Sequence, residues 1–220
     1  MVISSYRPRI DGPEYALERL LMGSIEGLLG GRPSGWWCAA SFPVGASRPD
    51  ILMATYEPHV RHLSQSAPLH INVISYLYGV RRARPETISA RIRKPIIGVK
   101  QALDRLVDLG IAKKASTSFY LNPTWRRVLP RVVSIEVKVK NWQRAIQQAK
   151  INLAFSHEAY VAVPKSIAYR IVQDQDFTST AIGLISLDGD TSSILRTPVP
   201  SLPSVPSYYF KIAAAVARTN

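Results

Sequence analysis

The spacing of apolar residues changes twice along this chain, at two polar segments that contain prolines, residues 58–68 and 123–130. Before the first segment and after the second, short apolar runs have the length of β-strands, whereas between them apolar residues recur at helical intervals. Proline disfavours continuation of either kind of element, so we expect both segments to be linkers. The sequence therefore predicts a discontinuous domain of residues 1–57 and 131–220, with a second domain inserted at residues 69–122.

Composition indicates a globular chain that folds around a sizeable core. Of its 220 residues, 46% are hydrophobic, and the mean hydropathy is +0.00, which excludes wholesale disorder. The start, MVISSYRPRIDG, lacks the apolar core of a signal peptide, and no run approaches the roughly 18 apolar residues of a membrane span. Cys38 is the single cysteine, so an internal disulfide and a cysteine-based zinc cluster are excluded. We expect a cytoplasmic protein with no membrane partner.

Positive charge is concentrated in one stretch of the chain. The protein has 28 Lys and Arg against 15 Asp and Glu, a formal net charge of +13. Residues 81–150 hold 17 of the basic and 4 of the acidic residues, so this stretch accounts for the whole excess. A localised excess of cations favours a polyanionic partner, and we expect nucleic acid; a basic surface that only improves solubility is the alternative.

Three helices followed by two strands are predicted between the linkers. Apolar spacing indicates helices at Ile71–Tyr78, Glu86–Ile92 and Pro95–Leu109, and Ile111–Leu121 has the pattern of two short strands. This order, and in particular KPIIGVKQALDRLVDLGIAKKASTSFYLN at 94–122, resembles the recognition helix and wing of winged helix-turn-helix domains. In that family the second helix of the pair lies in the major groove and the wing contacts the backbone or minor groove. The resemblance implies binding of double-stranded DNA; a winged helix used for protein contact is the alternative.

The resemblance also assigns candidate DNA contacts and a core face to the third predicted helix and the wing. Flexible cations suit phosphate contacts, and a side-chain amide can both donate to and accept from a base. The outward-facing candidates are Lys94, Lys100, Gln101, Lys113, Lys114, Ser116 and Ser118. The residues expected in the core are Ile97, Leu103, Leu106, Val107 and Leu109.

The two flanking segments predict a sheet with helices. A helix at 13–29 precedes strands at 36–42 and 51–56, and after the insertion a strand at 132–139 leads to a helix at 142–155. This alternation is typical of an α/β fold. The further elements expected downstream are a strand at 159–163, a helix at 166–172, strands at 181–187 and 193–197, a proline-rich extended arm at 198–206 and a short helix at 211–218.

Acidic and basic residues coincide on the strands that flank the insertion. Alternate residues of a strand share a face, so Glu136 and Lys138 are expected on one face of their strand. Asp50 begins the strand before the insertion and lies beside Glu136 if the two strands pair. Pro49-Asp50 on one strand and Glu136-x-Lys138 on the next resemble the PD-(D/E)XK nuclease superfamily, which includes restriction endonucleases and Holliday-junction resolvases. The resemblance implies a restriction-endonuclease-like α/β fold, a mixed sheet flanked by helices, with the winged helix-turn-helix domain inserted into it.

The same resemblance implies phosphodiester hydrolysis with Mg²⁺ or Mn²⁺. Asp50 and Glu136 would supply carboxylate ligands, and the carbonyl of Val137 would supply a further oxygen. Such an ion polarises the phosphate and lowers the pKa of a bound water. Lys138 would orient or deprotonate that water and stabilise the charge that develops in the transition state.

Two helices contribute further candidates by the same resemblance. An acidic residue on the first helix is expected at Glu18, with Glu14 as the alternative because positions four apart share a helix face. Gln148, on the helix after Lys138, matches a glutamine that family members often carry, and it would position the scissile phosphate. Taken singly, these patterns have simpler explanations, since a Pro-Asp pair is typical of turns and Glu-x-Lys is typical of an exposed strand.

The sequence therefore predicts a DNA-binding protein, and the residues favour a metal-dependent DNA endonuclease. Cutting both strands requires two sites, which is consistent with a homodimer. The first alternative is a non-catalytic DNA-binding regulator whose nuclease-like domain is a scaffold. The second is an interaction module of a larger defence or mobile-element complex, in which the basic face meets RNA or a protein. The complete domain between Asp50 and Glu136 departs from the family pattern, in which a short loop joins the two strands.

Overall fold

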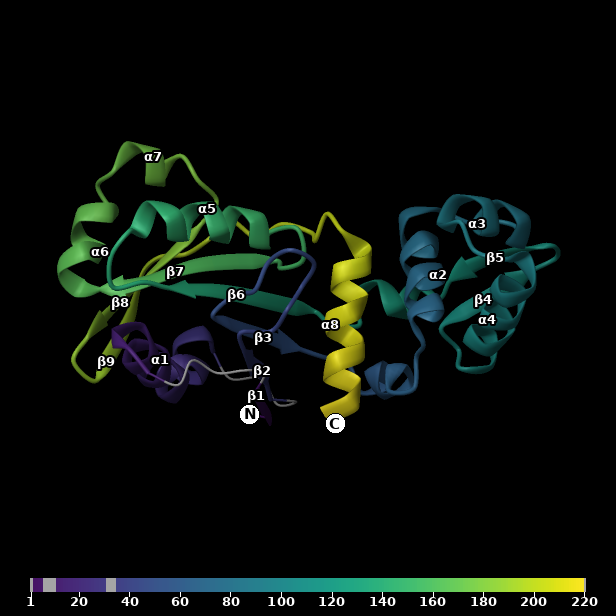
Figure 1. Cartoon of the computed structure of the whole chain (residues 1–220), viewed down its shortest axis with the longest axis horizontal. Helices are drawn as coiled ribbons and strands as arrows, with labels where there is room; N and C mark the ends of the chain where they lie inside the picture. The colour runs from purple at the N-terminus through teal and green to yellow at the C-terminus, as the bar shows by residue number, and fades with distance from the viewer. Residues whose placement is uncertain (1, 6–10, 31–34, 220) are drawn as a thin grey trace. The chain divides into compact units, whose positions relative to one another are not determined.

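The computed structural model describes residues 2–5, 11–30 and 35–219 of the chain. Helices and strands alternate through most of these ranges (Figure 1). None of the helices within them combines the length and the apolar character that a bilayer crossing needs.

Contacts divide the chain into two compact units. The sheet unit comprises Met1–Thr55 and Arg131–Ser204, and the helical unit comprises Tyr56–Pro130 and Val205–Asn220. The first two boundaries lie next to those expected from the proline-containing segments. The third was not expected, because the sequence assigned everything after residue 131 to the sheet.

Among the described residues, seven strands form one mixed sheet in the order β1-β2-β3-β6-β7-β8-β9. β2, β3 and β6 are successive antiparallel neighbours, and β6, β7 and β8 run parallel. At the two edges, β9 is antiparallel to β8 and β1 is parallel to β2. The strands are β1 (Val2–Ser5), β2 (Trp37–Ala40), β3 (Ile51–Thr55), β6 (Arg131–Val137), β7 (Glu158–Pro164), β8 (Gly183–Asp188) and β9 (Thr191–Arg196).

Helices cover both faces of this sheet, as Figure 1 shows. On one face, α1 buries Leu21 and Ile25 against β6 and its neighbours. On the other face, α5 buries Ala145 and Ala149 against β7, together with α6 and α7. The unit is therefore an α/β structure with a mixed sheet between helices, as predicted, although β1 and α7 were not foreseen. The helices are α1 (Pro13–Leu29), α5 (Trp142–Asn152), α6 (Lys165–Ile171) and α7 (Gln175–Thr178).

Alternation along β6 separates the two faces of the sheet. Ile135 and Val137 are fully buried in the cluster beneath α1, whereas Glu136 accepts a hydrogen bond from Asn152 of α5. The predicted opposition between Glu136 and its apolar neighbours is confirmed. β6 ends at Val137, two residues earlier than predicted, so Lys138 is no longer held to the alternation. Its ammonium group instead approaches an acidic residue of α1, and Glu136 and Lys138 have different neighbours.

The helical unit contains the predicted three helices and two-stranded hairpin. β4 and β5 pair antiparallel through a short turn at residues 116–117. Two short 3-10 helices, η1 and η2, occupy the segments expected to be linkers, so those segments are structured parts of the unit. The elements are η1 (Pro58–Leu63), α2 (Pro68–Gly79), α3 (Pro85–Ile92), α4 (Ile96–Asp108), β4 (Ala112–Ala115), β5 (Ser118–Leu121), η2 (Pro123–Arg127) and α8 (Pro206–Thr219).

The buried face of α4 differs from the prediction at its first turn. Leu103 and Leu106 are fully buried, as expected, and Val99 joins them. Ile97, which was expected in the core, is 71% exposed. The helical period explains the difference, because positions 99, 103 and 106 share one stripe of the helix and position 97 lies off it.

The C-terminal helix α8 packs within the helical unit. Its buried Phe210 meets the ring of Tyr78 in α2, with ring centroids 5.7 Å apart. The hydroxyl of Tyr209 donates to the carbonyl of Leu129 and accepts from the backbone N–H of the same residue, at 3.1 and 2.8 Å. The assignment of residues 205–220 to the sheet domain was therefore wrong, because the apolar face of α8 has its partners in α2 and the segment after η2.

Replacing Phe210 with alanine tests this assignment of α8. The substitution leaves a cavity against α2 and is expected to destabilise the helical unit by about 3–5 kcal/mol. Hydrogen exchange should accelerate in α2 and η1, while the amides of β6 and β7 keep their protection. Lys211→Ala, at the next position but on the exposed face of α8, is the matched control. Faster exchange in the sheet, or equal effects of both variants, would contradict the assignment.

Candidate functional site

Strands β3 and β6 bring two segments together across the inserted part of the chain. Their antiparallel register pairs Ile51 with Ile135, and one further step of that register sets Asp50 opposite Glu136. The backbone carbonyl of Asp50 accepts a hydrogen bond from the N–H of Ser41 at 2.9 Å, which holds this end of β3 to the segment after β2. The two strands pair, so the condition under which the sequence placed Asp50 beside Glu136 is met.

Asp50 and Lys138 form a buried ion pair at this end of the sheet. Oδ2 of Asp50 accepts from Nζ of Lys138 at 3.0 Å and from the backbone N–H of Val137 at 2.8 Å. The same ammonium donates to the carbonyl of Val137 at 2.9 Å and lies 3.6 Å from Oε2 of Glu14. Only 6% of the Asp50 side chain and 11% of the Lys138 side chain are exposed. Three oxygens from three parts of the fold therefore compensate one buried cation.

Glu136 is held from the opposite side by α5. It is 1% exposed, and its Oε1 accepts a hydrogen bond from Nδ2 of Asn152 at 2.8 Å. Oδ1 of Asn152 in turn accepts from the hydroxyl of Ser47, in the loop between β2 and β3. The chain Ser47–Asn152–Glu136 fixes the orientation of the carboxylate, because both ends of the Asn152 amide are occupied.

Helix α1 carries two acids on the side that faces the sheet. Glu14, in the first turn, is half-buried and is the one whose carboxylate lies near the Lys138 ammonium. Glu18, one turn later, is 5% exposed and lies on the same stripe as the buried Leu21 and Ile25. The sequence favoured Glu18 and kept Glu14 as the alternative; the ion pair with Lys138 involves Glu14.

Gln148 projects from the middle of α5, one turn before Asn152. Its Oε1 is buried and has no hydrogen-bond partner among the described residues. A buried amide oxygen without a partner is uncommon in a folded protein and indicates a group that a ligand or water satisfies. Because Gln148 and Asn152 are four residues apart, they share a face of the helix.

The oxygen atoms of this site have the chemistry that Mg²⁺ prefers. Asp50 and Glu136 contribute carboxylates, and Val137 contributes a carbonyl. No three His, Cys, Asp or Glu side chains of the described ranges gather into a metal-binding group. Proteins commonly hold Mg²⁺ by one or two carboxylates, with waters and substrate phosphates completing its shell. These are donor types that suit such an ion, but they have different partners: Asp50 Oδ2 and the Val137 carbonyl bind the Lys138 ammonium, whereas Glu136 is bound by Asn152 of α5.

An open cavity lies beside the ion pair. It has a volume of about 370 Å³ and lies between the start of α1 and the segment after β6. Glu14 lines it, together with Val139 and the exposed Lys140. Since Glu14 also faces Lys138, the cavity gives a solvent-side approach to the buried charges.

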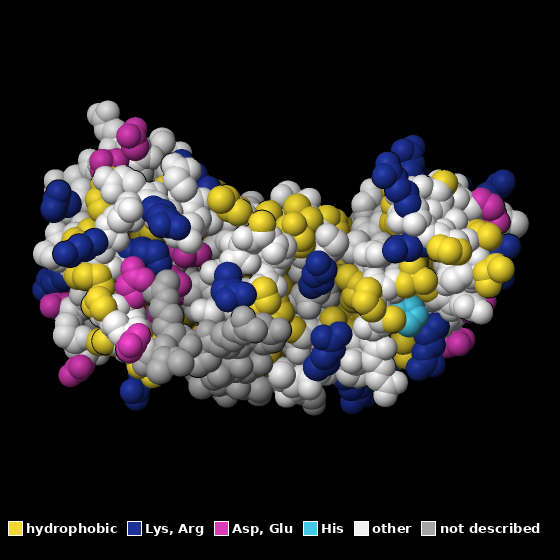
Figure 2. Space-filling model, viewed as in Figure 1, with side chains coloured by type: hydrophobic (Ala, Val, Ile, Leu, Met, Phe, Trp, Pro, Cys, Tyr) yellow, Lys and Arg dark blue, Asp and Glu magenta, His cyan; other side chains and the backbone are white. Residues whose placement is uncertain are grey.

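The helical unit carries most of the net charge of the protein. Its residues include 15 Lys and Arg and 4 Asp and Glu, so the unit holds +11 of the total of +13. Figure 2 shows Lys and Arg side chains spread over the visible face of this unit, around α2, α3 and α4. By contrast, Arg131 and Lys138 of the basic stretch belong to the sheet unit and form internal ion pairs, Arg131 with Glu158 at 2.7 Å.

The candidate DNA contacts lie on α4, before it and on the hairpin. Lys100 makes a loose ion pair with Glu86 at 3.8 Å, and both side chains are more than half exposed. Ser116 has a φ of 55°, the left-handed conformation that tight hairpin turns require. The exposed candidates are Lys94, Lys100, Gln101, Lys113, Lys114 and Ser116, whereas Ser118 is half-buried.

Sequence reasoning missed Asn152 and Ser47 as members of the site. The signal for Asn152 was its spacing, four residues after Gln148 on one helix; nothing in the sequence pointed to Ser47. No family model, no curated protein and no solved structure matches this chain.

Substitutions at the ion pair test whether the Lys138 ammonium needs a buried counter-charge for the sheet unit to be stable. Asp50→Ala removes the closest anion from the Lys138 ammonium and is expected to destabilise the sheet unit by about 3–5 kcal/mol. Asp50→Ala combined with Lys138→Met removes both charges and should recover most of that stability, because an apolar pair needs no compensation. Urea titrations followed by hydrogen exchange at β3 and β6 measure both effects. A double variant no more stable than Asp50→Ala would show that the ammonium is not the source of the cost.

Proposed function

We propose that this chain is a metal-dependent DNA endonuclease with a PD-(D/E)XK-type sheet domain and an inserted winged helix-turn-helix domain. The observation that carries the proposal is the meeting of Asp50 and Lys138, 88 positions apart in sequence, at the ends of β3 and β6. Glu136 lies on the same strand end and is held by Asn152. Two carboxylates and an amine buried at one end of a sheet are costly to maintain, and hydrolysis of a phosphodiester needs these groups.

The order of elements supports both parts of the proposal. In the sheet unit, α1 is followed by the antiparallel strands β2, β3 and β6, then by α5 and the parallel strand β7. This is the sequence of elements that the nuclease resemblance implies. In the helical unit, α2, α3 and α4 precede the hairpin β4–β5, which is the order of a winged helix.

The proposed reaction places a DNA phosphate at the mouth of the cavity beside Glu14. Asp50, Glu136 and the Val137 carbonyl would hold Mg²⁺, which supplies polarisation of the phosphate and a lower pKa of the attacking water. Gln148 would donate its amide N–H to a phosphate oxygen, and its Oε1 would accept from a water. The acid of α1, Glu14 or Glu18, would complete the site on the other side.

Lys138 has two states in this proposal. Without substrate, the charge of its ammonium is balanced by the carboxylates of Asp50 and Glu14, and the ammonium also donates to the Val137 carbonyl. If Asp50 held a metal ion, Nζ of Lys138 would lose this partner and would be available to a water and a phosphate oxygen. There it would orient the water and offset the negative charge that accumulates in the transition state.

The helical unit would bind duplex DNA. The exposed Lys94, Lys100, Lys113 and Lys114 would contact phosphates, and Gln101 would reach base edges. The exposure of Ile97 adds an apolar side chain to this face of α4, and such side chains contact the methyl group of thymine.

A second candidate function is a DNA-binding protein without catalysis. It is favoured by the charge of the helical unit together with the lack of a three-ligand metal group among the described residues. In that case the Asp50–Lys138 pair is a permanent structural contact. DNA affinity would then be independent of Glu136 and Lys138, and no DNA would be cut.

Cleavage of DNA in the presence of Mg²⁺ or Mn²⁺ tests the enzymatic proposal. Lys138→Ala is expected to reduce the single-turnover rate at least about a hundredfold, since general acid–base and electrostatic contributions are of that size. Lys165→Ala is the matched control, because Lys165 is a half-exposed lysine of the sheet unit whose ion pair with Asp188 lies on the surface. Cleavage that Lys138→Ala leaves unchanged, or a complete lack of cleavage with either ion, would remove the catalytic role.

Salt dependence tests the role of the helical unit. Lys113→Gln/Lys114→Gln should weaken binding to duplex DNA and reduce the slope of log K against log salt by about 0.9 for each phosphate that the protein no longer neutralises. Lys138→Ala should leave that slope unchanged. The measurement is a fluorescence anisotropy titration at several salt concentrations, with duplex, single-stranded DNA and RNA as ligands. Tighter binding to RNA than to duplex, or a slope unaffected by the wing lysines, would contradict the assignment.

A further inference from the structure

A polar pocket in the helical unit lies outside both proposed sites. Its volume is about 290 Å³, and it is formed by η1, the short segment before α2, the first turn of α2 and the last turns of α4. The candidate DNA contacts of α4 are at its first turns, and the hairpin candidates lie on β4, on β5 and in the turn between them. The pocket residues Arg61, Ser66, His70 and Arg105 therefore have no role so far.

Positive charge in this pocket has no counter-charge among the described residues that line it. Arg61 and Arg105 both line it, and neither forms an ion pair with any described residue. None of the described residues in the lining is acidic. Burial, and then the nearby Arg105 guanidinium, lower the pKa of His70 below its ordinary value, which is consistent with the two side chains lying close together. Two guanidinium groups around a concave surface favour an anion there.

Neutral donors complete the lining. Ser66 is 7% exposed, and its hydroxyl is buried with no hydrogen-bond partner among the described residues. Nδ1 of His70 accepts a hydrogen bond from the backbone N–H of Ala67 at 3.1 Å. A neutral histidine that accepts at Nδ1 carries its proton on Nε2, so His70 is also a donor. A buried hydroxyl without a partner is an incomplete arrangement that a bound oxyanion would complete.

We propose that this pocket binds a phosphate monoester, with Arg61 and Arg105 neutralising its charge and Ser66 and His70 donating to its oxygens. A phosphate monoester is mostly dianionic at neutral pH, with three strongly accepting oxygens, which matches a lining of cations and donors without acids. The volume is at the lower end of the range for small-molecule sites, about 300 Å³, and is larger than an isolated ion needs. The monoester is the end group of a small phosphorylated molecule or the 5′-phosphate of a DNA strand. This inference does not depend on cleavage by the sheet unit.

Calorimetric titration of the full chain tests the proposal. The probes are inorganic phosphate, adenosine 5′-monophosphate, and a short duplex with and without 5′-phosphates, all at one ionic strength. We expect one phosphate compound bound per chain, with affinity lowered about tenfold or more by Arg105→Gln and clearly lowered by Ser66→Ala, because hydrogen bonds to a charged group are involved. Ser66→Ala changes no charge and deletes one hydroxyl, so it keeps the test valid if Arg105→Gln does not fold.

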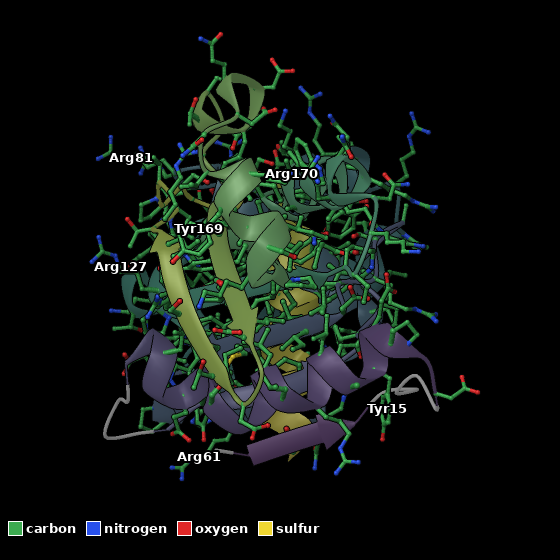
Figure 3. All side chains as sticks on the ribbon, turned by 90° about the vertical axis from the view of Figure 1, so that its left-hand side faces the viewer. Tyr15, Arg61, Arg81, Arg127, Tyr169 and Arg170 are labelled. Atoms are coloured by element: carbon green, nitrogen blue, oxygen red, sulfur yellow. The ribbon has the colours of Figure 1, made fainter. Side chains whose placement is uncertain are left out.

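Arg81→Gln is the matched control for general surface charge. Arg81 follows α2 in the same unit, and Figure 3 shows its side chain in solvent and well away from Arg61. This control should leave phosphate affinity within about twofold of the parent. Preference for adenosine 5′-monophosphate would identify a small-molecule site, and preference for the 5′-phosphorylated duplex would identify a DNA end; both support the pocket. A lack of binding by every probe, or an equal drop in affinity in Arg81→Gln and Arg105→Gln, would overturn it.

Discussion

A lysine ammonium removed from water is the constraint on which the sheet unit depends. The charge of the Lys138 ammonium is compensated when three groups are in position: Asp50 at the start of β3, the Val137 carbonyl and Glu14 of α1. Burial of the pair therefore requires β3 to pair with β6 and α1 to lie across them. Apolar residues in these positions would often be at least as stable, so the stability of the fold alone does not account for the buried charges.

The inserted helical unit is compatible with that constraint because the chain leaves and rejoins the sheet at paired residues. Thr55 and Arg131 are partners in the register of β3 and β6, and the N–H of Glu57 donates to the carbonyl of Val128 at 2.9 Å. The insertion thus takes the place of a hairpin loop. Lengthening a loop between fixed ends costs little entropy, which removes the physical objection to a whole domain between Asp50 and Glu136.

Periodicity in the sequence was sufficient to predict most helices and strands, because the spacing of apolar residues indicates which face of each segment is buried. It was insufficient to predict which elements pack against one another. The apolar pattern of residues 211–218 predicts a helix but cannot say that Phe210 packs on Tyr78 and not on the sheet. Ile97 is a residue type that is usually buried, yet its side chain is exposed. The sequence predicted that Asp50 and Lys138 lie near each other but not that they form an ion pair, because the end of β6 determines the direction of the Lys138 side chain. The role of Asn152 is apparent only from its hydrogen bond with Glu136.

The position of α8 has a consequence for how the protein is made. A ribosome synthesises the residues of η1 through η2 before the strands β6 to β9, and the fourteen residues of α8 follow those strands. Newly synthesised α2 therefore exposes the surface that Tyr209 and Phe210 later cover throughout the time in which the sheet emerges. The helical unit can therefore complete its packing only after the strands β6 to β9 have been synthesised.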